Sequence, residues 1–190
     1  AARIDSKRTQ INTIEDATTR GQRLAVTAQG EAKVLSATVP AVSSATQFTR
    51  PADITAYASG DIVANSTTAG SVAALTFTSA ARISAGALQV RRARIRKSTT
   101  TTSNASFRLH LFREAPTTAN GDNAAFTGVA NTNDSYIGAI DITIDRVFSS
   151  GSVGYGAPTV GNELNVKLAS GSSIYGLLEA TAAYAPGNAE

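Results

Sequence analysis

The sequence contains no cysteine, and this absence excludes disulfides, thiolate metal sites and cysteine nucleophiles. Histidine occurs once, as His110, so a histidine-rich metal site is excluded as well. A Ser-His-Asp triad would have to use that residue, yet no GxSxG motif occurs in the chain. We therefore assign His110 a structural or surface role and expect no enzyme activity, no metal and no cofactor.

Charge and long apolar runs are also scarce. Charged residues make up 16% of the chain, below the ~25% typical of globular domains, and the surface is expected to be polar but weakly ionic. The formal net charge of +3 is small for a dedicated nucleic-acid binder. No apolar run approaches the ~20 residues that cross a bilayer, so no membrane association is expected.

Two strand-like segments, 87–97 and 105–114, flank the polar linker 98–104 and organise the chain. The second segment alternates apolar and polar residues, which is typical of a strand buried on one face. In the first segment the alternation slips at Arg91-Arg92, which predicts either a β-bulge or a strand that changes partners there. The apolar residues expected to share a face are Leu88 and Val90 in the first segment, and Phe107, Leu109 and Leu111 in the second.

Other short apolar segments follow one another between turn residues, and no helix of ordinary length interrupts them. The expected strands are 46–50, 62–64, 73–79, 136–148, 163–169 and 173–184, with loops at 128–135 and, rich in glycine, at 149–161. This succession predicts an all-β fold, an antiparallel β-sandwich, and within that class a jelly roll.

Residues 1–45 differ from the rest and are expected to form an N-terminal arm ahead of a domain at 46–190. Ile4, Ile11 and Ile14 fall on one helical face, but they are too few to hold an isolated helix in water. A β-hairpin is expected around Gly30. The arm is therefore expected to order against a partner or against its own domain.

A row of arginines is the most distinctive charge pattern. Arg92, Arg94 and Arg96 share one face of the expected strand, ~6.6 Å apart. Three interpretations stay open. The row is a solvated face whose stems cover apolar neighbours, a rim that pairs with acidic residues of a partner protein, or a nucleic-acid-binding face. The last is the least favoured, because no aromatic residue interleaves on this strand.

The carboxylates suggest no active site. Asp141 and Asp145 lie ~13 Å apart on one strand face, farther than paired glycosidase carboxylates, and a solvated face explains them. Asp122 and Asp134 sit in asparagine-rich loops without EF-hand spacing. Turn-forming side-chain hydrogen bonds account for both loops, and a bound cation stays an open alternative.

Five segments in order resemble a known group of proteins. They are FTRPAD (48–53), YASGDIV (57–63), FRLHLF (107–112), DNAAF (122–126) and YIG (136–138). Together they resemble small structural proteins of tailed-bacteriophage virions, over about residues 46 to 140. The resemblance implies a head decoration, or cement, protein with a jelly-roll body. It implies a dimer or trimer that is made in the bacterial cytoplasm and binds the major capsid protein on the capsid surface. It carries over no catalytic residue and no small-molecule substrate.

We expect the arm and the basic row to contact capsid protein or adjacent copies, through Arg3, Ile4, Arg8, Ile11, Ile14, Arg92, Arg94 and Arg96. One alternative is a tail, neck or baseplate component of the same kind of virion, which copy number per particle would separate. Another is a carbohydrate-binding β-sandwich module. It would need an exposed aromatic platform, in a chain with no tryptophan and five tyrosines.

Overall fold

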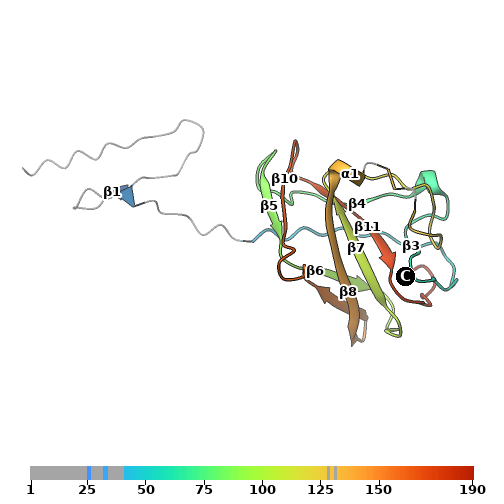
Figure 1. Ribbon diagram of the computed structural model, residues 1–190. Helices are drawn as coiled ribbons and strands as arrows, with labels where there is room; N and C mark the ends of the chain where they lie inside the picture. Colours follow the sequence, from blue (N-terminus) through green and yellow to red (C-terminus); the bar gives the residue numbers. More distant parts are fainter. Residues whose placement is uncertain (1–24, 27–31, 34–40, 128, 131) are drawn as a thin grey trace, which may run out of the picture. The chain divides into compact units, whose positions relative to one another are not determined.

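The computed structural model describes residues 25–26, 32–33, 41–127, 129–130 and 132–190 (Figure 1). The contacts divide the chain between Ala41 and Val42, and each part is described by itself; the boundary expected at 45/46 stays a prediction. In the first part β1 (Ala25–Val26) pairs antiparallel with β2 (Ala32–Lys33). Antiparallel pairing at these positions is what the hairpin expected around Gly30 requires, and the turn itself lies outside the described residues.

The second part is built on a seven-stranded sheet within the described residues, and all its pairings are antiparallel. The strand order is β3-β11-β7-β8-β9-β6, and β4 also pairs with β11. The bounds are β3 (Ile62–Val63), β4 (Leu75–Phe77), β6 (Ala93–Lys97), β7 (Ser106–Phe112), β8 (Tyr136–Phe148), β9 (Gly151–Gly156) and β11 (Ile174–Ala180).

Two features of this order determine which strands lie at the edges of the sheet. Strands β7, β8 and β9 follow one another as a meander, and β6, which precedes them, lies beside β9, as in a Greek key. At the other side, β3 and β4 share one edge of β11, pairing with Leu178 and Glu179 and with residues 174–176, respectively. Strand β6 therefore ends the sheet.

A second, two-stranded sheet pairs β5 (Ala87–Val90) with β10 (Leu164–Lys167). The chain passes from β5 to β6 through Arg91-Arg92, and the two strands pair with β10 and β9 respectively. Of the two outcomes expected at the slip in alternation, the change of partners is therefore the one found. The architecture is all-β and sandwich-like.

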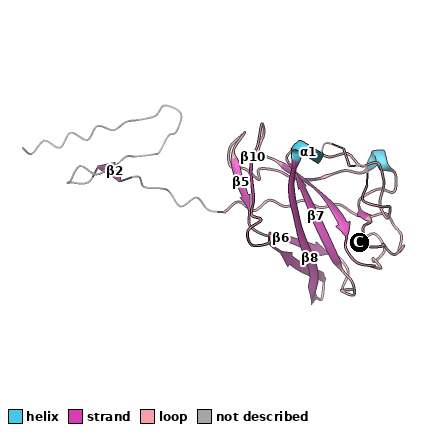
Figure 2. Cartoon of the chain, viewed as in Figure 1, coloured by secondary structure: helices cyan, strands magenta, loops and turns pink. Residues whose placement is uncertain are grey.

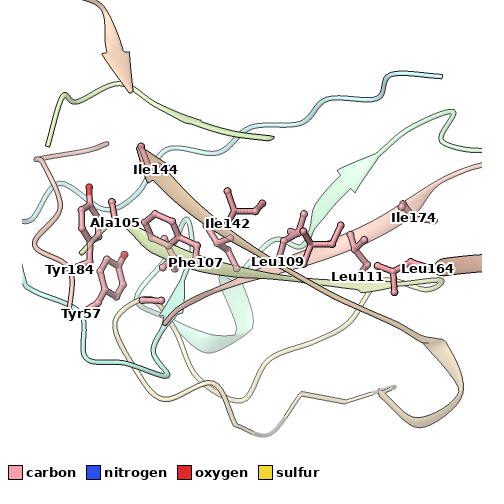
Figure 3. Close-up of a cluster of buried hydrophobic side chains, with 14 of the residues drawn as sticks. Tyr57, Ala105, Phe107, Leu109, Leu111, Ile142, Ile144, Leu164, Ile174 and Tyr184 are labelled. Carbon is pink, nitrogen blue, oxygen red and sulfur yellow. The ribbon is translucent and has the colours of Figure 1, made fainter. Parts of the chain in front are cut away.

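The core follows the predicted alternation. Phe107, Leu109 and Leu111 of β7 are buried, and the polar residues between them are only partly buried. Ile140, Ile142 and Ile144 of β8 are each 1% exposed. Full burial of such a side chain contributes about 1.5–3 kcal/mol. Figure 3 shows the core running from Tyr57 and Tyr184 at one end to Ile174 and Leu164 at the other.

Helix is limited to single turns in the described part of the chain, η1 (Ala69–Ser71) and α1 (Thr132–Ser135) (Figure 2). The loop expected over 128–135 thus contains one helical turn. None of the helices described here has the length and apolar character needed to span a membrane.

Two secondary-structure predictions are wrong. The glycine-rich segment expected as a loop contains β9, which lies between β8 and β6. Its glycines allow close strand contact, since a Cβ on Gly154 would lie 2.2 Å from the carbonyl oxygen of Thr143. Conversely, residues 46–50 were expected as a strand and belong to no ladder. Their burial alternates as in a strand, which explains why the pattern misleads.

Candidate partner interface

Strand β6 places its arginines on the surface. Ala93 and Ile95 are half-buried and Lys97 is buried, whereas Arg94 and Arg96 are exposed, as is Arg92 just before the strand. This alternation follows from one face of the strand packing on the core. The three arginines therefore lie together at the edge of the main sheet.

The three arginines have no acidic partner among the residues that the structure describes. Among the described residues, no carboxylate oxygen lies within the 4.0 Å ion-pair distance of any of their guanidinium groups. Arg92 instead lies over the ring of Tyr155, with its Cζ 5.1 Å from the ring centroid. Because an exposed cation–π contact contributes only about 0.5–1 kcal/mol, their positive charge stays largely uncompensated.

Tyr155 is a neighbour of the arginine row that the sequence analysis did not identify. It belongs to β9, pairs directly with Arg94 across the ladder and is 45% exposed. It was missed because residues 149–161 were expected to form a loop. The alternation of Val153 and Tyr155 with Ser152 and Gly154 was the available signal. An aromatic side chain therefore does accompany the arginine row, on the neighbouring strand.

The basic surface continues onto β8. Val153 of β9 pairs with Arg96 on one side and with Arg146 on the other, so the three residues form one cross-strand row. Arg146 is exposed, and its Nε lies 3.9 Å from Asp145. We call Arg92, Arg94, Arg96 and Arg146 the basic face.

A groove of about 450 Å³ opens beside β6. Residues 94–98 form one wall, and residues 46–50 form another. Both walls are consecutive stretches of chain, so backbone as well as side chains lines the groove. Its apolar lining includes Phe48, Val63, Leu75, Phe77, Phe107 and Leu109.

A buried ion pair contributes to the lining of the groove. Lys97 Nζ lies 3.4 Å from Glu190 Oε1 and donates hydrogen bonds to Tyr184 (2.8 Å) and Thr99 (2.7 Å). Burial lowers the pKa of Lys97, and Glu190 opposes this shift. Burial acts to raise the pKa of Glu190, but hydrogen bonds from Thr99 and Tyr184 hold it below its usual value. The charge of Lys97 is thus neutralised internally.

A second buried ion pair involves Arg50, which also lines the groove. Asp122 accepts hydrogen bonds from Arg50 Nη2 (3.1 Å), Tyr57 Oη (2.7 Å) and the Ala64 N–H (2.7 Å). Tyr57 also stacks on Tyr184 with the ring centroids 6.3 Å apart, which joins the two clusters. Burial and the hydrogen bond to Asp122 raise the pKa of Tyr57. Arg50 and Lys97 are therefore structural cations, and of the cations lining the groove only Arg94 and Arg96 are left to meet a ligand.

The two loop carboxylates considered for cation binding, Asp122 and Asp134, have different surroundings. The carboxylate of Asp122 is used by Arg50, and Asp134 lies in α1. Among the described residues, no cluster of three or more His, Asp or Glu side chains could hold a metal ion. Asp141 is exposed and forms two hydrogen bonds with Arg108, at 2.7 and 2.9 Å.

His110 lies on the outward face of β7 within a small polar cluster. Its Nε2 is 2.7 Å from Glu179 Oε2, its Nδ1 is 3.1 Å from the Tyr136 hydroxyl, and its ring stacks on Phe126. Burial lowers the pKa of His110, and Glu179 opposes that shift. No serine or threonine hydroxyl is hydrogen-bonded to this ring among the described residues. The cluster ties β7, β8 and β11 together across the outer face of the sheet.

Of the residues expected at an interface, the structure brings together Arg92, Arg94 and Arg96. The five arm residues lie outside the described part of the chain; they are Arg3, Ile4, Arg8, Ile11 and Ile14. Comparisons with protein-family models, with curated proteins and with solved structures give no match. The exposed arginines Arg94 and Arg96 thus belong both to the basic face and to the lining of the groove.

Proposed function

We propose that this chain is a structural protein of a tailed-bacteriophage virion that decorates and stabilises the capsid by binding the lattice of major capsid protein. The observation that carries the proposal is the basic face on an edge strand, where Arg92, Arg94 and Arg96 have no acidic partner among the described residues. Uncompensated charge at a sheet edge suits docking onto an acidic protein surface.

The resembling segments support a jelly-roll body. Arg50, Tyr57 and Asp122 come from three of these segments and are hydrogen-bonded to one another in the interior. A fourth segment, 107–112, is the strand β7 within the main sheet. The motifs that carry the resemblance are thus the residues that hold the body together. The Greek-key arrangement of β6 to β9 agrees with such a body.

The physical logic of a decoration protein fits a modest interface. A ligand that binds only the assembled lattice stabilises it by mass action. Many copies on one shell make weak individual contacts sufficient through multivalency. Dimers or trimers on the capsid surface would add to this effect.

Cryo-electron microscopy of intact particles tests the proposal. An array of copies over the whole shell supports the decoration role. A few copies at one vertex or along the tail favour the neck, tail or baseplate alternative. Absence from particles refutes a virion role of either kind.

A capsid-binding assay tests the role of the basic face. In co-sedimentation with purified capsids, the double variant R94Q/R96Q should lose most of its occupancy. The matched control is R113Q/K167Q, which removes the same charge from side chains with no charged partner among the described residues. Equal occupancy of the two variants would contradict the proposed use of the basic face.

A further inference from the structure

The outer edge of β6 has no strand partner in the described part of the chain. All five residues of β6, Ala93–Lys97, pair with β9 on one side. Residues 94–98 line the groove, and they include inward-facing and outward-facing positions of β6, as expected where the edge of a strand borders a groove. An edge with open N–H and C=O groups is a template for an added strand.

The wall formed by residues 46–50 is also strand-like and has no strand partner among the described residues. Burial alternates from Thr46 to Arg50, with Phe48 turned inward, as it does in a strand. The backbone hydrogen bond found there among described residues joins the Arg50 N–H to the Glu190 carbonyl at 3.3 Å. Two strand-like walls without a ladder between them enclose about 450 Å³, within the range of ligand sites.

We propose that an extended segment of a partner protein, with alternating apolar and acidic side chains, enters this groove and pairs with β6 as an added strand. Its inward side chains would pack on the apolar lining, which includes Phe48, Phe77 and Leu109. Its outward side chains would meet Arg94 and Arg96, which are exposed and unpaired among the described residues.

Charge selects an acidic partner over the arm of a second copy. Residues 1–24 carry five basic and three acidic side chains, and the only charged residue in 32–39 is Lys33. Such segments would place like charges beside Arg94 and Arg96, which is unfavourable. A strand with glutamate or aspartate at alternate positions reverses the sign of that interaction.

This inference deepens the proposed function by naming the kind of capsid-protein segment that binds, and its test needs no particles. The probe is the synthetic peptide acetyl-EVEVEVE-amide, titrated against the full chain by isothermal calorimetry. Two control peptides carry lysine in place of glutamate, or proline in place of valine. Proline keeps the charge but removes backbone donors needed for a ladder.

The expected result is binding of the glutamate peptide that R94Q/R96Q weakens about tenfold or more, with little change in R113Q/K167Q. Added salt should weaken binding of the glutamate peptide to the unmodified protein, because at 0.15 M salt exposed charges are screened beyond ~8 Å. The lysine and proline peptides should not bind. Thr46→Trp, which places a large side chain in the groove, should abolish binding, and its unchanged thermal midpoint would exclude misfolding.

Hydrogen exchange separates strand addition from simple charge attraction. Strand addition predicts slower exchange at every second amide of 93–98, those that point away from β9, when the peptide is bound, because those N–H groups gain partners. Binding without that protection would overturn the proposal. Tighter binding of a peptide copying 32–39 would assign the groove to a second copy, and preference for an oligothymidylate would assign it to nucleic acid. Capsid occupancy without peptide binding would refute strand addition in the groove and leave the proposed function intact. Peptide binding without capsid occupancy would refute the proposed function and leave strand addition intact.

Discussion

Asp122→Asn should be among the most damaging single-atom changes in this protein. The carboxylate is fully buried, and the Arg50 side chain that it neutralises is 3% exposed. Asparagine retains an oxygen for the Tyr57 hydroxyl and the Ala64 N–H, so the charge is the main loss. Removing one partner of a buried ion pair costs about 3–5 kcal/mol.

For a domain of this size, each kcal/mol shifts the thermal midpoint by about 2–4 °C, so a drop on the order of 10 °C is expected. Thermal and urea unfolding followed by circular dichroism measure it. The matched control is Asp53→Asn, whose carboxylate lies 3.6 Å from the same guanidinium group but is 33% exposed. This exposed pair should contribute below about 1 kcal/mol.

A double-mutant cycle isolates the pair. Arg50→Met alone should also destabilise, because it leaves the buried Asp122 carboxylate without its cation. Combining Arg50→Met with Asp122→Asn should cost much less than the sum of the two single changes. Additive losses, or equal losses for Asp122→Asn and Asp53→Asn, would refute the reasoning that burial makes this pair strong.

Three other changes should give measurable effects in urea unfolding. Gly154→Ala should cost about 1–3 kcal/mol, since its Cβ would lie 2.2 Å from the Thr143 carbonyl oxygen, whereas Gly70→Ala has nothing within 4 Å and should be neutral. The free energy of unfolding should fall as pH drops below ~6.5, because burial lowers the pKa of His110 and the unfolded state takes up the proton first. His110→Gln should flatten that slope between pH 7 and 5, and an unchanged slope would contradict this source. Ile142→Ala should cost about 2–5 kcal/mol, because Ile142 is a core residue, 1% exposed.

The sequence predicts a strand well where one face is buried, the other is exposed, and few residues are glycine. In β7 and β8, apolar and polar residues alternate because one side meets the core and the other meets solvent. The slip in alternation at Arg91-Arg92 is also visible, because the inward parity shifts there, but the pattern alone fits both a β-bulge and a change of partners. These features are local, and local patterns report them.

The rest depends on contacts between distant residues. Glycine has no side chain to alternate, so β9 gives little signal although it is an inner strand of the sheet. Alternating burial without hydrogen-bonded partners makes residues 46–50 resemble a strand. Lys97 and Glu190 look like surface charges until the fold buries them together. The free edge of β6 is a property of the whole sheet order and cannot be predicted from β6 alone.

The position of β11 has a consequence for synthesis of the protein. Strands β3 and β4 emerge early from the ribosome, yet their partner in the sheet is Ile174–Ala180. Strand β7 must likewise wait for β11 on one of its edges. Such non-local pairing slows folding and leaves strand edges exposed in the nascent chain. We therefore expect this domain to fold only after most of its residues have been translated, and to depend on chaperones or on dilution when refolded in vitro.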